Sequence, residues 1–157
     1  MADAVLLQID AALMRLRRLW DVPGKVPTDT GDLVDASTVL VVDAIRRLSP
    51  GAVHVADIAR QLQVSPSTAS RLVSRAHQAG MVQTQGSDRD PRAKAVTLTP
   101  SGRELATGSL RFRERMLAAA THTWQESDRE TFADLLGEFA DGVDRLPSPW
   151  NQTRKQR

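Results

Sequence analysis

Apolar side chains recur every three to four residues along the first twenty residues of the chain. Val5, Ile9 and Leu16 belong to one such series. This spacing predicts an amphipathic helix from Ala2 to Trp20. Its apolar face is too wide for a lone helix in water, so we expect the helix to pack against another element.

A cluster of helix-breaking residues follows this helix. Two prolines and two glycines lie between residues 21 and 33, which predicts a connecting loop from Asp21 to Leu33. A second helix is predicted from Asp35 to Leu48. It is expected to end at Ser49-Pro50-Gly51, because proline cannot continue the hydrogen-bond ladder and glycine accommodates the turn.

Two short helices joined by a tight turn are predicted next, from Val55 to Leu62 and from Pro66 to Gln78. Ser65 can accept a hydrogen bond from a free N–H at the start of the second of these helices. The apolar face of that helix is expected to contain Ala69, Leu72, Val73 and Ala76. Its outward face is expected to carry Ser67, Ser70, Arg71, Ser74 and Arg75.

This pair of helices fits a helix-turn-helix motif. The motif needs a small residue where the first helix meets the second, and Ala59 supplies it. The turn position that is often glycine carries Gln63, which can adopt a left-handed backbone only at a cost of roughly 1–2 kcal/mol. Two helices joined this tightly are expected to cross steeply.

The hydrophobic period changes from about 3.6 residues to about 2 after Gly80. Val82 and Thr84 alternate with polar residues, and Val96 and Leu98 do the same, which predicts a hairpin. The connection from Gly86 to Lys94 is expected to be a long charged loop, because it exceeds the usual length of about two to five residues. A loop of that kind usually contacts a partner.

Two longer helices are predicted to complete the fold. The first begins after Thr99 and runs to about Trp124. Ser127 and Glu130 have the spacing of a capping box, which predicts a last helix from Ser127 to Leu146. Its buried stripe is expected to contain Phe132, Leu135, Leu136, Phe139 and Val143.

The composition mainly excludes certain kinds of site and classes of protein. The chain has no cysteine, which excludes disulfides, thiol nucleophiles and cysteine-ligated zinc. No apolar run approaches the roughly 18 residues of a membrane span, and no signal-peptide pattern is present, so a cytoplasmic protein without membrane contact is expected.

Sequence motifs of hydrolases, nucleotide-binding loops and metalloproteases are absent, so we expect neither an enzyme nor a cofactor. His77 and His122 are expected at the surface or an interface, with no metal site.

The positive charge is concentrated in the middle of the chain. In total, 21 basic and 19 acidic side chains give a net charge of only +2. Between Arg60 and Lys94, however, six basic residues stand against two acidic ones, an excess of +4. If the protein binds a polyanion, this segment is expected to do so.

Two stretches of the chain resemble the MarR family of transcriptional regulators (multiple antibiotic resistance regulators). The first is VADIARQLQVSPSTASRLV, which begins at Val55, and the second is DRDPRAKAVTLTPSGR, which begins at Asp88. The first pattern is shared by many winged-helix groups. The second is more specific, because an Asp-x-Arg wing that leads into Leu-Thr-Pro-x-Gly and a long helix is typical of this family.

The resemblance implies a mainly α-helical fold with a small β-hairpin wing, that is, a winged helix-turn-helix with N- and C-terminal dimerisation helices. It divides the chain into an N-terminal dimerisation helix and loop (1–34), a DNA-binding domain (35–99), C-terminal dimerisation helices (100–146) and a flexible basic tail (147–157). It implies a homodimer on a palindromic operator. Two-fold symmetry then places the half-sites about 34–36 Å apart. The wide apolar faces of the helices independently favour burial between two copies.

The expected DNA contacts fall into two groups. Base edges in the major groove are assigned to Ser67, Thr68 and Arg71, because arginine can bind guanine O6 and N7 in a bidentate manner. Phosphates are assigned to Ser65, Ser70, Ser74 and Arg75. In the wing, Arg92 matches the family's minor-groove arginine and Asp90 the acid that holds it. Arg89 and Lys94 are expected to neutralise phosphates.

Two further expectations concern partners and alternatives. Family members are commonly released from DNA by small anionic or phenolic molecules, so the resemblance implies a repressor with such an effector, whose binding residues the sequence does not indicate. A winged helix can also serve only in protein association, and this alternative stays open. Duplex binding that weakens between about 50 and 200 mM salt would favour DNA over that alternative, because counterion release requires it.

Overall fold

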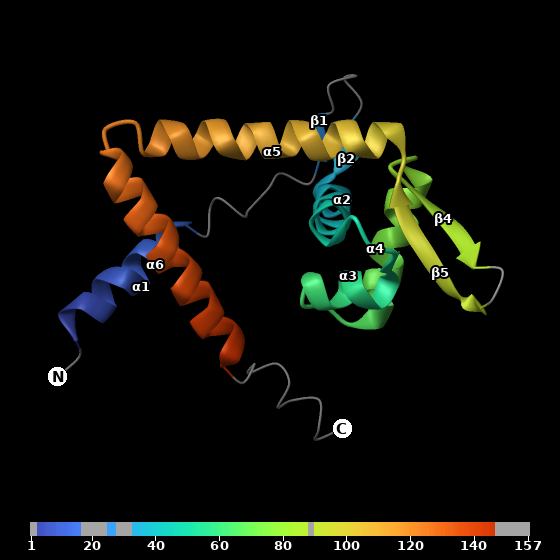
Figure 1. Cartoon of the computed structure of the whole chain (residues 1–157), viewed down its shortest axis with the longest axis horizontal. Coiled ribbons are helices and arrows are strands. Elements are labelled where there is room, and N and C mark those ends of the chain that lie inside the picture. The colour runs from blue at the N-terminus through green and yellow to red at the C-terminus, as the bar shows by residue number, and fades with distance from the viewer. Residues whose placement is uncertain (1–2, 17–24, 28–32, 88–89, 147–157) are drawn as a thin grey trace. The chain divides into compact units, whose positions relative to one another are not determined.

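The computed structural model describes residues 3–16, 25–27, 33–87 and 90–146 of the chain (Figure 1). The chain divides into two compact units, residues 1–112 and 113–157. The elements in chain order are α1 (Ala4–Leu16), β1 (Lys25–Pro27), β2 (Leu33–Asp35), α2 (Ala36–Leu48), β3 (Val53–His54), α3 (Val55–Gln61), α4 (Pro66–Gln78), β4 (Val82–Ser87), β5 (Asp90–Leu98), α5 (Pro100–Ala120) and α6 (Glu126–Arg145). The predicted fold class, mainly α with a winged helix-turn-helix, is therefore confirmed.

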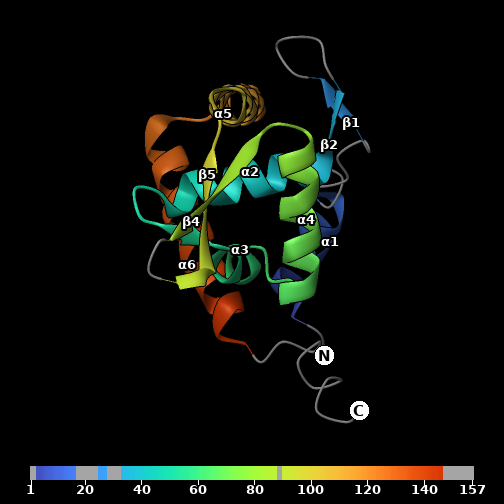
Figure 2. The ribbon, with the colours of Figure 1, turned by 90° about the vertical axis from the view of Figure 1, so that its right-hand side faces the viewer.

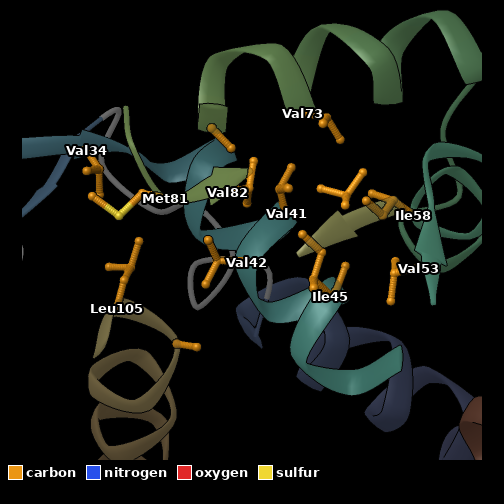
Figure 3. Close-up of a cluster of buried hydrophobic side chains, with 14 residues drawn as sticks. Val34, Val41, Val42, Ile45, Val53, Ile58, Val73, Met81, Val82 and Leu105 are labelled. Carbon is orange, nitrogen blue, oxygen red and sulfur yellow. The ribbon is translucent and has the colours of Figure 1, made fainter. Parts of the chain in front are cut away.

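The core of the first unit is built around α2. Its Val41, Val42 and Ile45 are at most 1% exposed, and they pack with Ile58 of α3 and Val73 of α4 (Figure 3). Burying branched aliphatic side chains of this size contributes about 1.5–3 kcal/mol each. This core holds α3 and α4 together and fixes which face of α4 points outward.

A three-stranded antiparallel sheet in the order β3-β5-β4 lies beside the helices. Val82 pairs with Leu98, and Thr84 with Val96, as the alternating pattern predicts. The third strand, β3, was not predicted. It has only two residues, Val53 and His54, and its pairing with β5 depends on a segment forty residues further along the chain, which no local pattern can indicate.

The hairpin connection is shorter than predicted. Gly86 to Lys94 was expected to form a long charged loop, but β4 runs to Ser87 and β5 starts at Asp90, and these two residues pair with each other. The register shifts between Gln85 and Ser87. Residues 91–94 of β5 lie opposite Gly86 alone, so this part of the hairpin is irregular. It has no alternating apolar pattern, and the sequence criterion depended on that pattern.

The predicted loop between the first two helices also contains unpredicted structure. β1 and β2 pair as an antiparallel ribbon, with Val26 opposite Val34. Val34 belongs to the hydrophobic core of the first unit, whereas Leu33 is exposed. The proline and glycine content indicates a break in the helix correctly, but it does not exclude short strands on either side of a turn.

Helix α1 covers most of the first predicted helix. It spans Ala4–Leu16, and the predicted end at Trp20 lies outside the described residues. None of the residues of α1 is buried. No helix in the described parts of the chain, α1 included, combines the length and the apolarity that crossing a membrane would require.

The second-last helix ends earlier than predicted. α5 stops at Ala120, and a turn follows in which the N–H of Trp124 donates to the carbonyl of Thr121. The indole of Trp124 packs edge-on against Phe132, with 5.3 Å between the ring centres. This contact stabilises the turn where a continuous helix to Trp124 was expected.

The predicted capping box at Ser127 is wrong, whereas the predicted burial of the apolar stripe of the last helix stays a prediction for the dimer. α6 already begins at Glu126, with Gln125 as its N-cap residue in an extended conformation. The side chain of Gln125 makes no capping hydrogen bond, and Trp124 of the preceding turn packs against Phe132 of α6. The five residues of the predicted buried stripe are 43–59% exposed in the single chain.

Candidate nucleic-acid interface

The turn between α3 and α4 has the predicted construction. Ala59 is buried at the helix junction, and its carbonyl accepts a hydrogen bond of 3.0 Å from the N–H of Val64. Gln63 has a φ of 53°, which is the left-handed conformation expected at this position. Figure 2 shows α4 from the side and α3 nearly end on, so the two helices cross steeply.

The N-terminus of α3 is capped by a side chain that the sequence interpretation did not consider. The Asp57 carboxylate accepts a hydrogen bond of 2.9 Å from the backbone N–H of His54. Asp57 also forms an ion pair with Arg60, whose side chain is 79% exposed. The charge of Arg60 is thus compensated within α3, so the positive excess that is free to act on a partner lies further along the chain.

Ser65 caps α4 as predicted. Its hydroxyl accepts a hydrogen bond of 3.1 Å from the N–H of Thr68, and Pro66 occupies the first helical turn. The cap satisfies one of the N–H groups that have no partner within the helix. Because α4 is 13 residues long, the partial positive charge at its N-terminus adds to the attraction for anions.

Hydroxyl groups gather around this cap. The Ser65 Oγ lies 3.0 Å from Ser67 Oγ and 2.8 Å from Thr68 Oγ1. Arg71 reaches the same cluster, with its Nη2 3.5 Å from Thr68 Oγ1. Ser67 and Arg71 are exposed, whereas Ser65 and Thr68 are half-buried. Two of the three residues assigned to base edges therefore point into solvent, and Thr68 bonds to the cap.

The outward face of α4 matches the predicted one. Ala69, Val73 and Ala76 are buried and fix the rotation of the helix. All five residues of the predicted outward face are exposed, namely Ser67, Ser70, Arg71, Ser74 and Arg75. This face offers hydroxyl groups and two guanidinium groups with no acidic side chain among them. Such a surface can bind an anionic backbone and donate hydrogen bonds to base edges.

The wing provides a second group of polar residues. Asp90, Arg92 and Lys94 lie along β5, and Arg89 lies outside the described residues. The sequence interpretation missed Gln83 and Gln85, which are exposed on β4. Their alternation with Val82 and Thr84 places the two amides on one side of the strand, and that spacing is the signal that could have identified them.

The histidines give no indication of a metal centre. His77 is exposed on α4, and the Nδ1 of His122 lies 2.9 Å from the carbonyl oxygen of Ala119. Across the described ranges, no three His, Cys, Asp or Glu side chains are grouped so that they could hold a metal ion.

Comparisons with known proteins agree with this geometry. Residues 34–93 match the family model described as the MarR family. No curated protein sequence matches the chain. Three solved structures illustrate the similarity of the fold.

A DNA complex of FabT from Streptococcus pneumoniae has a TM-score of 0.75 at 17% identity, and the match covers 90% of this chain and 99% of that one. A MarR/EmrR family transcriptional regulator from Acinetobacter sp. ADP1 has a TM-score of 0.68 at 17% identity, with 92% and 100% covered. BpsR from Bordetella bronchiseptica, whose DNA binding is regulated by 6-hydroxynicotinic acid, has a TM-score of 0.62 at 21% identity, with 88% and 99% covered.

Proposed function

We propose that the chain, whose residues 34–93 match the MarR family model, is a MarR-family protein and a sequence-specific DNA-binding transcriptional regulator. It acts on double-stranded DNA and catalyses no reaction. One observation carries the proposal: the core packing of Ala69, Val73 and Ala76 leaves α4 with an outward face of hydroxyl and guanidinium groups.

In the proposed complex, the N-terminal half of α4 enters the major groove. Ser67 and Arg71 contact base edges there, and Thr68 supports them from the cap. A bidentate arginine contact to guanine contributes about 1–3 kcal/mol of discrimination against other bases. Ser65, Ser70, Ser74 and Arg75 contact phosphates, which position the helix on the duplex but carry no sequence information.

The wing is proposed to contact the adjacent minor groove through Arg92, with Asp90 holding the guanidinium group. Arg89 and Lys94 contact phosphates beside it. The length of β5 supports this proposal, because the strand continues as far as Asp90, which pairs with Ser87 of β4. A stiff hairpin can hold a basic side chain at a fixed distance from α4, whereas a long loop would have to be ordered on binding.

We propose that the functional unit is a homodimer on a palindromic operator. The apolar residues of α1 and α6 that are exposed in the single chain support this proposal. A soluble protein rarely leaves apolar stripes of that extent in water. An isologous interface would cover the same stripe on both copies and place two α4 helices one turn of DNA apart, about 34–36 Å.

The proposed mode of regulation is repression that a small anionic or phenolic molecule relieves. The structural similarity to BpsR, which 6-hydroxynicotinic acid regulates, supports this choice of chemistry, since that compound carries a carboxylate and a hydroxylated ring. Such an effector must favour a spacing of the two α4 helices that does not fit the operator. By linkage, DNA must then weaken effector binding by the same factor.

Selection of bound fragments from random duplex DNA by the purified protein tests the proposal. The expected result is a palindrome whose affinity falls steeply between about 50 and 200 mM salt, since counterions are released from phosphates on binding. Absence of duplex binding, or binding that salt does not affect, would instead favour a winged helix that binds only proteins.

A further inference from the structure

The end of α4 and the start of α5 are connected by a compact joint, which we define as Gly80, Met81, Thr99 and Gly102. The Thr99 hydroxyl donates to the carbonyl oxygen of Gly80 at 2.7 Å and accepts from the N–H of Gly102 at 3.0 Å. The N–H of Thr99 donates to the Met81 carbonyl at 3.1 Å. One residue thus binds both the exit of α4 and the first turn of α5.

The joint is connected directly to the recognition helix. The N–H of Met81 donates to the carbonyl of Ala76 at 2.9 Å, and the N–H of Gly80 donates to that of His77, also at 2.9 Å. Both acceptors belong to the last turns of α4. A movement of Met81 relative to α5 would therefore require these hydrogen bonds, or those of Thr99, to change.

Gly102 permits a backbone approach that no other residue allows. A Cβ at this position would overlap the carbonyl oxygen of Met81, lie 3.0 Å from its carbonyl carbon and 3.5 Å from Cδ2 of Leu98. The principal obstacle is backbone, so it cannot yield by rotation of a side chain. An alanine here must push the first turn of α5 away from Met81.

The side chains around the joint make this approach rigid. Figure 3 shows Met81 between Val34 and Leu105, and all three are buried in the core cluster. Leu105 follows Gly102 by one helical turn on α5, and Ala106 next to it is also buried. The start of α5 is therefore held on two sides, by hydrogen bonds at Thr99 and by apolar packing at Leu105.

A small change in the direction of α5 displaces the far end of the helix by several ångströms. The helix has 21 residues, so it is about 31 Å long at 1.5 Å per residue. A tilt of about 5° at its start moves its end by about 3 Å, close to the rise of one base pair, about 3.4 Å. α5 also carries the chain out of the first unit into residues 113–157.

We propose that Gly102 and Thr99 are positioning residues that set the separation of the two α4 helices in the dimer, and with it the half-site spacing that the protein selects. This inference rests on the proposed function, because it requires a dimer that binds DNA. The joint fixes the direction of α5, and α5 leads to the helix that carries the proposed dimer contacts. Binding of both half-sites at once is possible only if that separation matches the operator.

The first test compares the full-length protein with its Gly102→Ala variant on a palindromic duplex and on a duplex with one half-site. The expected result is at least a tenfold loss of affinity for the palindrome, with less than a twofold change for the half-site, since the outward face of α4 is intact. Repeated selection with spacers of different length should return a different preferred spacing. A variant that is merely less stable would lose affinity for both duplexes and keep the spacing.

Gly137→Ala is the matched control. Gly137 is also helical, nothing lies within 4 Å of a Cβ there, and its position on α6 is on the side away from the apolar stripe. We expect its palindrome affinity and its selected spacing to equal those of the original protein.

The Thr99 variants provide a second test that introduces no overlap and does not depend on the folding of Gly102→Ala. Thr99→Val removes both hydroxyl hydrogen bonds, and Thr99→Ser keeps them. We expect Thr99→Val to lower the ratio of palindrome to half-site affinity at least threefold and Thr99→Ser to restore it. Equal ratios in all three proteins would overturn the inference, whereas an original protein that selects no duplex at all would overturn the proposed function instead.

Discussion

The hydroxyl of Ser65 and that of its neighbour Ser67 have different surroundings, although the two residues are only two positions apart. Ser65 accepts a backbone N–H hydrogen bond from Thr68, whereas Ser67 is exposed in the first turn of α4 and its hydroxyl lies within hydrogen-bond distance of the Ser65 hydroxyl. A cap contributes to the stability of the folded protein, and an exposed hydroxyl contributes to binding. The two roles can therefore be separated by experiment.

We predict that Ser65→Ala lowers the free energy of unfolding by about 0.5–2 kcal/mol, the usual cost of losing an N-cap. Ser67→Ala serves as the control and should change it by less than about 0.5 kcal/mol, as is usual for surface positions. Urea denaturation followed by circular dichroism measures both values. Equal destabilisation by the two variants would contradict the assignment of the cap.

The two arginines on the outward face of α4 should affect different properties of DNA binding, one the base preference and the other the overall affinity. We predict that Arg71→Ala weakens operator binding by about 1–3 kcal/mol and relaxes the preference at one base pair. Arg75→Ala should weaken binding to all duplexes equally and reduce the slope of log K against log salt by about 1. Titrations at several salt concentrations distinguish the two effects. Arg111→Ala, exposed on α5, is the control and should leave both quantities unchanged.

Local rules predicted the residues of the helix-turn-helix well. The buried and outward faces of α4, the Ser65 cap and the left-handed backbone at Gln63 were all inferred from the sequence and are confirmed. Each of these depends on residues within one or two helical turns, so a local pattern contains the information. The hydrogen bond from the His54 N–H to the Asp57 carboxylate at the start of α3 was not predicted.

At the scale of elements, the wing differs most from its sequence interpretation. β4 extends to Ser87 and β5 starts at Asp90, so Arg92 lies in strand β5, in the irregular stretch between the pairs Gln85–Ala95 and Ser87–Asp90. The pair of Ser87 with Asp90 closes the hairpin beyond this stretch, and backbone pairing of that kind requires no alternation of apolar residues. A pattern of buried residues therefore underestimates a strand that leaves the core.

We predict that Arg92→Ala weakens operator binding by about 1–3 kcal/mol, in line with the loss of a groove contact. Because the residue lies in the wing, the variant should retain the α4 specificity and the unfolding free energy of the original protein. A titration at fixed salt measures the affinity. An unchanged affinity would refute the proposed minor-groove contact, and loss of specificity at the α4 positions would assign Arg92 a different role.

Helix α6 shows how tertiary contacts move a boundary. The Ser127 and Glu130 pattern is a valid local signal, yet the helix starts at Glu126 after a turn that Trp124 and Phe132 stabilise. A capping box contributes only about 1 kcal/mol. Packing of two aromatic rings can outweigh it, and the sequence does not state which contact will form.

At the scale of the whole molecule, the main feature is the pair of exposed apolar faces on α1 and α6. Residues of the α6 stripe are 43–59% exposed in the single chain, although their pattern is that of a buried face. The pattern was interpreted correctly as apolar, but a second copy, rather than this chain, is the proposed cover. An apolar stripe of this kind indicates that the helix face will be buried, but it does not indicate which surface will cover it.

We predict that Leu135→Glu dissociates the proposed dimer and removes the avidity for the palindrome. A carboxylate buried in an apolar interface without a partner costs several kcal/mol, whereas in the single chain the position is exposed and the helix remains compatible with glutamate. Sedimentation equilibrium measures the association.

Ala133→Glu is the control for that variant. It adds the same charge at an exposed position of α6 near Gly137, on the side away from the stripe, and should leave the dimer intact. A dimeric Leu135→Glu variant would show that another surface joins the two copies.

The sequence by itself determined the helix-turn-helix, the existence of the hairpin, the outward face of α4 and the concentration of basic residues in the middle of the chain. These features follow from periodicity, capping residues and charge, which act between neighbours along the chain. Tertiary structure decided the pairing of β3 with β5, the length of the wing, the start of α6 and the close approach of Gly102 to Met81. Each of these features depends on contacts between atoms that come together only on folding. The energies of those contacts cannot be inferred from a local sequence pattern.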